Sequence, residues 1–316
     1  MNVAGTPDLT FLAPSGAVAD WRLVVLVDAA AGTGLLDALP GTPPDLAART
    51  GLQPDAVRRV LEALVTVEVC TERDGVYHAE PIPAEDLAVL RHHAHMIGRW
   101  SHGLGPALRG EGTPGGRLPH DLDVFLPALA GRARQRAATV VEHARELLPA
   151  ATRVLDLGGG HGEDALAFAR AGFDVTLQDL PPVIEWVRRR GELEEAGVRL
   201  VAGDLTEVLA DGPFDLVLLA GLTHIFPPAE VAELLRRLHD RVSVDGGLAI
   251  STRLRGQSAT SALFSVQMLL VGRGGDTHSR QEYDGWLARA GFPRTVEVPV
   301  ATDGLGDTKV LFALQR

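Results

Sequence analysis

Short apolar runs and helical segments alternate along the second half of the chain. The runs have the β-branched and aliphatic composition of buried strands, and they lie at residues 153–157, 174–178, 199–202, 214–220 and 247–253. Helical patterns occupy residues 183–196, 228–242, 258–271 and 281–290, and a closing strand pair follows at 295–300 and 309–314. Strands that alternate with helices predict an α/β fold with a doubly wound, mostly parallel sheet.

The first third of the chain has a mostly helical pattern. Residues 20–39 form a long apolar segment with helical spacing, and residues 42–51 form a short helix with proline in its first turn and glycine after its end. A second helix ends at Val65, and the runs 67–70 and 75–78 predict a small hairpin. This order is typical of a winged helix, so we place a winged-helix-like domain at residues 1–112 and a second domain at 113–316.

Charge argues against the DNA-binding function that a winged helix suggests. Such a module places its second helix in the major groove, and phosphate binding needs a basic surface. The net charge is −11, and residues 1–110 hold 8 arginines against 13 acidic residues. We therefore expect no nucleic-acid partner, and we expect the N-terminal module to mediate dimerisation or to cover a substrate.

Residues 87–108 and 123–148 predict two further helices, and the first of them carries His92, His93, His95 and His102. His92 and His95 are three residues apart and would share a helical face. No third ligand completes a metal-binding motif, so we expect no metal and favour a solvated or pocket-lining histidine cluster.

The cysteine count and the hydropathy indicate the cellular setting. Cys70 is the only cysteine, so no intrachain disulfide can form. No apolar run reaches the roughly 18 residues of a membrane span, and no signal-peptide pattern opens the chain. We expect a cytoplasmic protein without a membrane partner.

A glycine-rich turn follows the strand at 153–157. Asp156 precedes glycines at 158, 159, 160 and 162, and a helical segment begins directly afterwards. A dinucleotide fingerprint would need glycine at the sixth position from Gly158, where Glu163 stands. The spacing of Gly158, Gly160 and Gly162 instead resembles motif I of S-adenosylmethionine (SAM)-dependent methyltransferases.

Acidic residues end the next two strands, where ligands bind in such sheets. Asp179 lies 21 residues after Gly158, near the spacing at which a carboxylate receives ribose hydroxyls, although an aspartate before Pro181 can also cap a helix. Asp204 is placed to meet the amino group of adenine, with Leu205 packing on the ring, although aspartate is common in plain turns.

His224 follows the fourth strand of the series. A hydroxyl oxygen is a far better nucleophile once it is deprotonated, and an imidazole can take that proton. The residue is therefore a candidate general base, with capping or packing before Pro227 and Pro228 as the alternative.

These features together resemble the SAM-dependent small-molecule O-methyltransferases of the plant caffeate and acetylserotonin type, in their bacterial natural-product branch. The resemblance rests on the 156–162 motif, on Asp179-Leu180-Pro181, on Gly203-Asp204 and on His224, and it spans nearly the whole chain. It implies a SAM-binding Rossmann-like catalytic domain, a homodimer formed through the N-terminal domain, and a small-molecule substrate. The implied SAM contacts are Asp156, Gly158, Gly160, Asp179, Leu180, Asp204 and Leu205. The implied substrate wall is Trp100, Phe125, Leu129, Phe264 and Met268.

The chain departs from the family around the candidate base. An aspartate usually follows the histidine, but Ile225 stands here, and the supporting glutamates align with Thr252 and Thr277. The leading hypothesis is methyl transfer from SAM to a hydroxyl of an aromatic or polyketide-like natural product, with His224 as the base. The missing acids motivate an alternative, in which bound SAM serves C- or N-methylation, or a decarboxylation, hydroxylation or cyclisation. A ligand-sensing DNA-binding regulator is a third hypothesis, which the acidic N-terminal domain disfavours.

Overall fold

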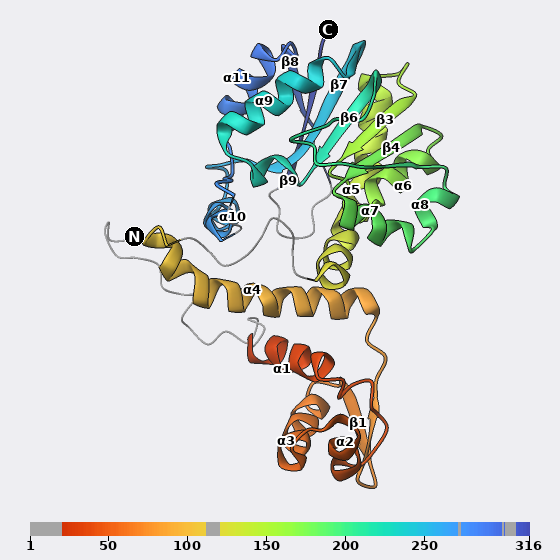
Figure 1. Cartoon of the computed structure of the whole chain (residues 1–316), viewed down its shortest axis with the longest axis vertical. Helices are drawn as coiled ribbons and strands as arrows, with labels where there is room; N and C mark the ends of the chain where they lie inside the picture. The colour runs from red at the N-terminus through yellow and green to blue at the C-terminus, as the bar shows by residue number, and fades with distance from the viewer. Residues whose placement is uncertain (1–20, 112–120, 271–272, 299, 301–307) are drawn as a thin grey trace, which may run out of the picture. The chain divides into compact units, whose positions relative to one another are not determined.

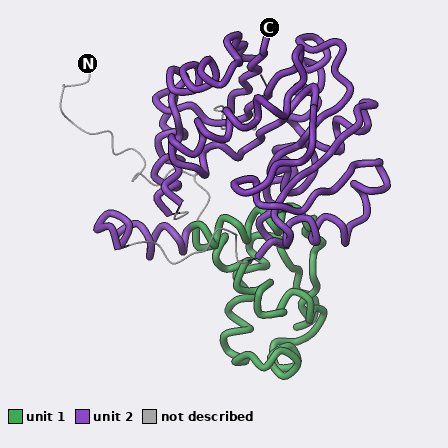
Figure 2. Tube along the Cα trace, turned by 45° about the horizontal axis from the view of Figure 1, so that its top comes forward, with its two compact units in different colours: residues 1–96 green, residues 97–316 purple. Residues whose placement is uncertain are grey.

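The computed structural model describes residues 21–111, 121–270, 273–298, 300 and 308–316 (Figure 1). The chain divides into two compact units, residues 1–96 and 97–316 (Figure 2). Helix α4, Ala84–Leu108, contributes to both units. The domain boundary expected at residues 112 and 113 lies outside the described residues, so it stays a prediction.

The first unit is a small helical module with a hairpin. Its elements are α1 Trp21–Gly32, α2 Pro43–Thr50, α3 Pro54–Val65, β1 Cys70–Arg73 and β2 Val76–Ala79. The Thr42 side chain caps α2, and Gly51 ends it in the left-handed conformation at φ 72°, as the proline and glycine pattern predicts. Leu46, Leu61 and Leu64 are fully buried in the core of this unit. The helix–helix–hairpin order is as predicted, and its assignment as a winged-helix dimerisation domain stays a prediction.

Two sequence predictions in the first unit are wrong in extent. The helix expected over 20–39 ends at Gly32, because Gly34 adopts φ 73° and turns the chain. The first hairpin strand begins at Cys70 instead of occupying 67–70. Residues before Cys70 close α3: the Val69 amide donates to the Leu64 carbonyl at 3.1 Å, and Glu68 has φ 59°.

The second unit contains a seven-stranded sheet with the order β5-β4-β3-β6-β7-β9-β8 (Figure 1). Its strands are β3 Arg153–Leu157, β4 Asp174–Asp179, β5 Arg199–Ala202, β6 Phe214–Ala220, β7 Val242–Arg253, β8 Arg294–Val298 and β9 Thr308–Leu314. The strands β5, β4, β3, β6 and β7 pair in parallel, and β9 runs antiparallel to both β7 and β8. The predicted doubly wound α/β fold is confirmed, with an antiparallel strand inserted near one edge.

Helices cover both faces of this sheet and form a core on each. The first core packs β3 and β4 against α5 Leu122–Leu147, α6 Glu163–Arg170, α7 Pro181–Arg188 and α8 Glu192–Glu195. The second packs β6 and β7 against α9 Pro228–His239 and α11 Arg280–Arg289, and α10 Ala259–Leu269 precedes α11 in the chain. Burial on both faces explains why β3 and β6 read as continuous apolar runs instead of alternating patterns.

Two element predictions in this unit are also wrong in extent. The helix expected over 183–196 is two helices, because Gly191 takes φ 76° between α7 and α8. The helix expected over 228–242 ends at His239, and Val242 belongs to β7, where it pairs with Phe214. Residues 242–246 are therefore part of β7, whereas the sequence pattern assigned 242 to the helix and left 243–246 out of any element.

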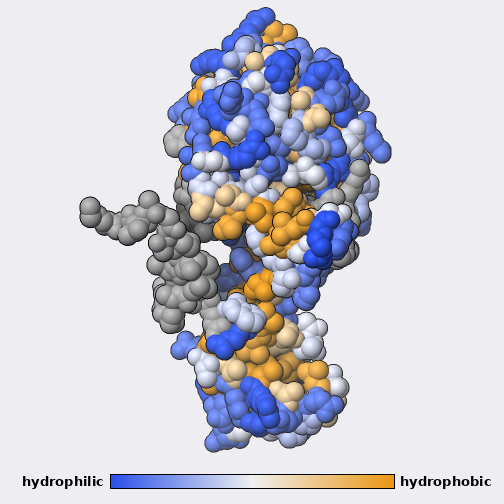
Figure 3. All heavy atoms as spheres, turned by 90° about the vertical axis from the view of Figure 1, so that its left-hand side faces the viewer, coloured by the Kyte–Doolittle hydropathy of each residue, from blue (hydrophilic) through white to orange (hydrophobic). Residues whose placement is uncertain are grey.

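The face seen in Figure 3 is largely hydrophilic, with hydrophobic patches between the polar areas. On α1, Trp21 and Val25 are 61% and 38% exposed, and on α10, Leu263 and Leu269 are 59% and 50% exposed. Among the described residues, no helix is long and apolar enough to cross a membrane.

Asp215 joins the amino ends of the central strands. Its carboxylate accepts hydrogen bonds from the amides of Thr152 and Arg153, at 3.0 and 2.9 Å, and from the Ser243 hydroxyl at 3.0 Å. Burial alone would raise the pKa of Asp215, but these bonds and the Arg153 guanidinium lower the pKa to about 2. The charged carboxylate therefore stabilises the β3–β6 pairing.

We expect Asp215→Asn to lower the free energy of unfolding by about 2 kcal/mol at pH 7, because the amide cannot accept the same charge-assisted bonds. Since the folded-state pKa is depressed, the stabilisation is complete above pH ~4 and is lost as the pH falls toward 2. Urea unfolding between pH 7 and pH 3 should show the wild-type and variant curves converging. Asp211→Asn, at a fully exposed carboxylate, is the control. A difference that is equal at both ends of the pH range would contradict this role.

Candidate active site

The carboxyl ends of β3, β4, β5, β6 and β7 lie along one edge of the sheet, because these strands are parallel. Strand order reverses between β3, which pairs with β4, and β6, which starts the other half. Ligands of open α/β sheets bind at such a reversal. The Gly158 turn, Asp204 and His224 follow these strand ends, and Asp179 is the last residue of β4, as predicted.

The turn after β3 requires glycine. Gly158, Gly160 and Gly162 have φ of 71°, 54° and 82°, in the left-handed region that side chains disfavour. A Cβ on Gly158 would lie 2.9 Å from Leu222 Cδ1, and one on Gly159 would lie 2.6 Å from the Asp156 carboxylate. The glycines therefore give the turn its conformation and let it pack directly against the neighbouring strand end.

Asp179 fastens this turn. The Gly160 amide donates to Asp179 Oδ2 at 2.9 Å, and the Leu180 amide donates to Oδ1 at 2.7 Å. Burial raises the pKa of Asp179, and the two amides oppose that rise. The helix-cap alternative is wrong, because the N-cap residue of α7 is Leu180 and no side chain caps it. Each carboxylate oxygen keeps a second lone pair for another donor.

Asp204 forms a turn after β5. Its Oδ1 accepts from the Thr206 amide at 2.9 Å and from the Thr206 hydroxyl at 2.6 Å. The turn geometry that we weighed as the plain alternative is therefore present, whatever else the carboxylate contacts. Leu205, the residue after Asp204, is held by Arg237, which donates to the Leu205 carbonyl at 2.9 Å.

Gln178 is a site residue that the sequence did not reveal. It is fully buried, its Nε2 donates to the Val208 carbonyl at 2.8 Å, and its Oε1 accepts from the Ala210 amide at 2.8 Å. These bonds tie β4 to the loop that carries Asp204. The only available signal was a polar residue inside an apolar strand, which needs a buried partner.

A charged cluster lies behind the glycine turn. Asp156 and Asp164 are 1% and 2% exposed, and Arg136 of α5 forms an ion pair with Asp164. Neither Asp156 oxygen makes a well-formed hydrogen bond to a described residue. Burial raises the pKa of Asp156 well above its usual value, Asp164 adds to the rise, and Arg136 opposes it. Two acids therefore share one guanidinium beside the turn, and burial disfavours the charged form of Asp156.

His224 lies in the 3-10 turn η2, Thr223–Ile225, which follows β6. Its ring meets the Phe264 ring edge to face at 4.7 Å between centroids, and the Arg253 guanidinium lies 4.5 Å from the Phe264 centroid. His224 Nδ1 is buried without a hydrogen-bond partner among the described residues. Burial, with the positive charge of Arg253 and the neighbouring His278, lowers the pKa of His224 to about 3. The imidazole is therefore neutral at physiological pH.

No carboxylate of the described chain hydrogen-bonds His224. Thr252, at the end of β7, is 3% exposed, and Thr277 is fully buried. These threonines stand where the family's supporting acids were expected, and neither can carry a charge.

The residues of the expected substrate wall lie on α4, α5 and α10. Phe264 contacts the His224 ring, and Met268 follows one turn later on α10, buried at 4%. Phe125 packs against the core that α5 shares with β3 and β4. Trp100 on α4 and Leu129 on α5 are both partly buried. Their substrate contacts stay predictions.

The histidines of α4 bond mainly to their own helix. His93 Nδ1 lies 2.8 Å from the Val89 carbonyl, and His102 Nδ1 lies 2.9 Å from the Gly98 carbonyl. His95 Nε2 lies 3.9 Å from Asp28 of α1. In the part of the chain that the structure describes, no group of three or more His, Cys, Asp or Glu could hold a metal ion.

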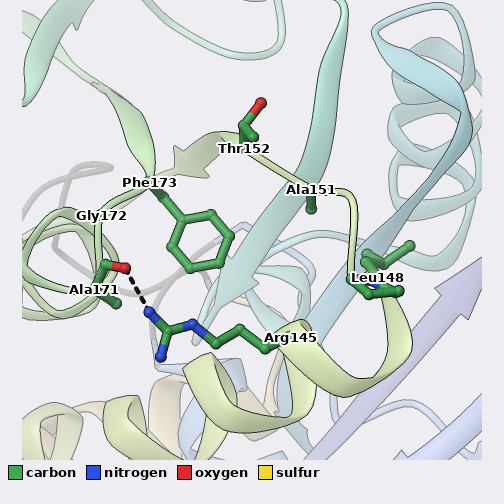
Figure 4. Close-up of a pocket in the computed structure, with 8 residues that line it drawn as sticks. Arg145, Leu148, Ala151, Thr152, Ala171, Gly172 and Phe173 are labelled. Carbon is green, nitrogen blue, oxygen red and sulfur yellow. Dashed lines mark hydrogen bonds between the residues drawn. The ribbon is translucent and has the colours of Figure 1, made fainter.

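A surface pocket lies at the opposite end of the sheet (Figure 4). Its lining includes Thr152 before β3 and Phe173 before β4, and Arg145 of α5 reaches the Ala171 carbonyl across it at 2.5 Å. It is therefore at the amino ends of the strands, away from the glycine turn and His224. It offers no group for the chemistry expected here.

Comparison with known families decides the assignment. The model of the O-methyltransferase domain matches residues 117–293, which is more than half of the chain. The chain belongs to the O-methyltransferase domain family. The predicted family and enzyme class, a SAM-dependent O-methyltransferase, are thereby confirmed.

Relatives of this O-methyltransferase agree with the assignment. The chain is 29% identical over 288 residues to the mitomycin biosynthesis 6-O-methyltransferase of Streptomyces lavendulae, covering 82% of this chain and 81% of that protein. It is 28% identical over 307 residues to the phenazine O-methyltransferase PhzM of Lysobacter antibioticus, covering 86% and 88%. The solved structure of PigF with S-adenosylhomocysteine superposes with a TM-score of 0.76 at 21% identity, covering 93% of this chain and 96% of that one, which establishes the common fold.

The site of this O-methyltransferase fits SAM. The glycines hold a turn that side chains would disrupt, Asp179 keeps lone pairs for hydroxyl donors, and Asp156 is a buried carboxyl group without a well-formed hydrogen bond. Gly158, Gly160 and Asp179 would hold the ribose side, and Asp204 and Leu205 would hold the adenine. These individual contacts stay predictions.

Gly158→Ala should weaken SAM binding at least tenfold, because the new methyl group meets Leu222 and the residue must keep a positive φ. Gly197→Ala is the matched control, since Gly197 has φ 80° but nothing lies within 4 Å of its Cβ position. Calorimetric titration with SAM should therefore separate close packing at the turn from backbone strain alone. Equal affinities of the two variants would contradict the proposed cofactor turn.

The partly buried imidazole of His224 predicts a pH dependence of stability. Because the folded-state pKa of His224 is lowered to about 3, the unfolded chain binds more protons than the folded chain between pH 3 and ~6.5. The stability contribution is thus complete above pH ~6.5 and declines as the pH falls. Over pH 6.5 to 4.5, wild type should lose up to about 1.4 kcal/mol per pH unit more than His224→Asn. Parallel unfolding curves of the two proteins would refute a lowered pKa of His224 in the folded protein.

Proposed function

We propose that this protein transfers the methyl group of SAM to a hydroxyl of a small aromatic or polyketide-like natural product, with His224 as the general base. The carrying observation is a neutral imidazole that follows β6 at the ligand-binding edge of the sheet, against the ring of Phe264. The names of the relatives support the substrate class, since those proteins methylate in mitomycin and phenazine metabolism.

The residues divide the work between binding and proton transfer. SAM, when bound, supplies an electrophilic methyl group on its sulfonium. The glycine turn and Asp179 orient the cofactor, and Phe264 with Met268 provides an apolar wall for a planar acceptor. Since His224 Nδ1 is buried, Nε2 is the nitrogen that would take the hydroxyl proton. Alignment of the reacting atoms can contribute about 7–11 kcal/mol to such a displacement.

Arg253 complements this base. Its guanidinium shares the Phe264 ring with His224 and lowers the pKa of the imidazole after burial, the larger cause. The same positive charge favours ionisation of an acceptor hydroxyl nearby. A weakly basic His224 would therefore act on a hydroxyl that is itself acidified, as in a phenol or an enol.

One observation supports a second candidate function. His224 has no carboxylate partner among the described residues, and a base without such support is less well oriented. The fold could then serve C- or N-methylation, or a SAM-dependent decarboxylation, hydroxylation or cyclisation. The mass of the product separates the cases, because only methylation adds a methyl group.

We also propose that the protein is a cytoplasmic homodimer. Trp21 is 61% exposed and Val25 is 38% exposed on α1, in the helical unit that the family resemblance assigns to dimerisation. Exposed apolar side chains of this kind favour association with another chain. The buried, free thiol of Cys70 agrees with a reducing compartment.

His224→Asn should lower methyl transfer by roughly 10²–10⁴-fold, because the amide cannot accept the proton, while SAM affinity stays unchanged. The assay is turnover of methyl-labelled SAM with phenolic and enolic polyketide-like acceptors, read by product mass and by S-adenosylhomocysteine release. His143→Asn, at a histidine paired with Glu146 on α5, is the control. Undiminished turnover in His224→Asn would remove this residue as the base, and an unlabelled product would favour the second function.

A further inference from the structure

Three hydroxyl groups form a buried network next to His224. Thr223 Oγ1 and the Tyr283 hydroxyl share a hydrogen bond of 2.7 Å, and the Tyr283 hydroxyl also donates to Thr252 Oγ1 at 3.4 Å. Thr223 and Tyr283 are fully buried, and Thr252 is 3% exposed. The network therefore joins the η2 turn, α11 and the carboxyl end of β7 through bonds that solvent does not replace.

Aromatic packing holds Tyr283 in place. Its ring meets the rings of His278 and Trp286 edge to face, at 5.9 and 5.5 Å between centroids. His278 and Trp286 also meet each other edge to face at 5.0 Å. Such pairs fix ring orientation beyond the effect of apolar burial. The packed rings of His278 and Trp286 therefore keep the Tyr283 hydroxyl in position to bond Thr223.

The backbone around His224 is packed against the same region. A Cβ on Gly275 would lie 2.2 Å from the His224 carbonyl and 2.6 Å from the Ile225 carbonyl. The segment before α11 therefore contacts the main chain of η2 directly. Thr223 is bonded on one side of η2 and Gly275 packs on the other, so the backbone that carries His224 has little freedom to shift.

The network carries no charge. Burial raises the pKa of Tyr283 to about 12, although the bonds from Thr223 and Thr252 oppose that rise. Thr252 and Thr277 replace the acids that the family resemblance leads one to expect. The network can therefore orient His224 through hydrogen bonds, but it supplies no negative charge that would stabilise the protonated imidazole.

We propose that Tyr283 is a positioning residue for His224: its hydroxyl holds Thr223, and through it the η2 turn, in the orientation that presents the imidazole to the acceptor. The inference rests on the proposed role of His224 as the base. Tyr283 itself touches neither substrate nor cofactor in this scheme. Its role is a neutral counterpart to the carboxylate that orients histidine in other active sites.

The test removes single hydroxyls at both ends of the bond. Tyr283→Phe and Thr223→Val each delete one partner, and Thr223→Ser keeps it. Tyr77→Phe is the control, since Tyr77 is 8% exposed in the other unit. If Tyr283→Phe does not fold, Thr223→Val tests the same hydrogen bond from its other partner.

The first readout needs no acceptor. In ¹⁵N-histidine NMR spectra of the full-length protein, the His224 ring signals are assigned by their absence in His224→Asn. We expect Tyr283→Phe and Thr223→Val to shift or broaden these signals, and Thr223→Ser and Tyr77→Phe to leave them unchanged. Unchanged His224 signals in both disrupted variants, whatever their melting temperatures, would overturn the proposal.

The second readout is kinetic, with an acceptor identified by the labelled-SAM assay. Tyr283→Phe should lower kcat roughly 5- to 30-fold with an unchanged KM for SAM, because misplacement of a reacting group costs rate more than binding. Combined with Thr223→Val it should cost no more than either single change. Additive losses would overturn the proposal. If His224→Asn were fully active, the proposed base would fail, and the NMR spectra would still decide whether Tyr283 positions the ring.

Discussion

Backbone pairing of β3 with β4 on one side and β6 on the other is the constraint on which the whole site depends. It places the reversal of strand order directly beside the glycine turn, so the loops after β4, β5 and β6 converge there. The positive φ angles of Gly158, Gly160 and Gly162 then keep the turn narrow enough for the Asp179 carboxylate to reach the Gly160 amide. At the amino ends of the strands, the Asp215 carboxylate of β6 accepts the amides of Thr152 and Arg153 and so joins β6 to the start of β3.

The two halves of the site differ in how they use buried polar groups. Behind the glycine turn, Asp156 and Asp164 are buried carboxyl groups, and Arg136 forms an ion pair with Asp164. Around His224 the buried groups are hydroxyls and aromatic rings, which suit a neutral imidazole and an apolar acceptor. Ile225, Thr252 and Thr277 stand where the family resemblance leads one to expect acids, so this region holds uncharged groups at those positions.

Sequence patterns located most strands, because residues buried on both faces of a parallel sheet must be apolar over their whole length. They failed where a glycine or a tertiary pairing overrides local propensity. Gly191 divides the helix expected over 183–196, and Val242 pairs with Phe214 as part of β7 instead of extending a helix. The side chains that serve as partners were the least accessible to prediction. Gln178 and Tyr283 meet residues about 30 and 60 positions away in the chain, and no spacing rule links such distant positions.

The sequence by itself determined the family, the strand-turn-helix at residues 153–170 and the positions of Asp179, Asp204 and His224 at strand ends, because those features are local and glycine spacing is specific. Only the tertiary structure decided that Asp179 binds the glycine turn instead of capping α7, that Asp204 closes a turn with Thr206, and that Tyr283 bonds Thr223 beside His224. The physical reason is that a hydrogen bond depends on the approach of two groups within about 3 Å, and that approach is fixed by the packing of distant segments.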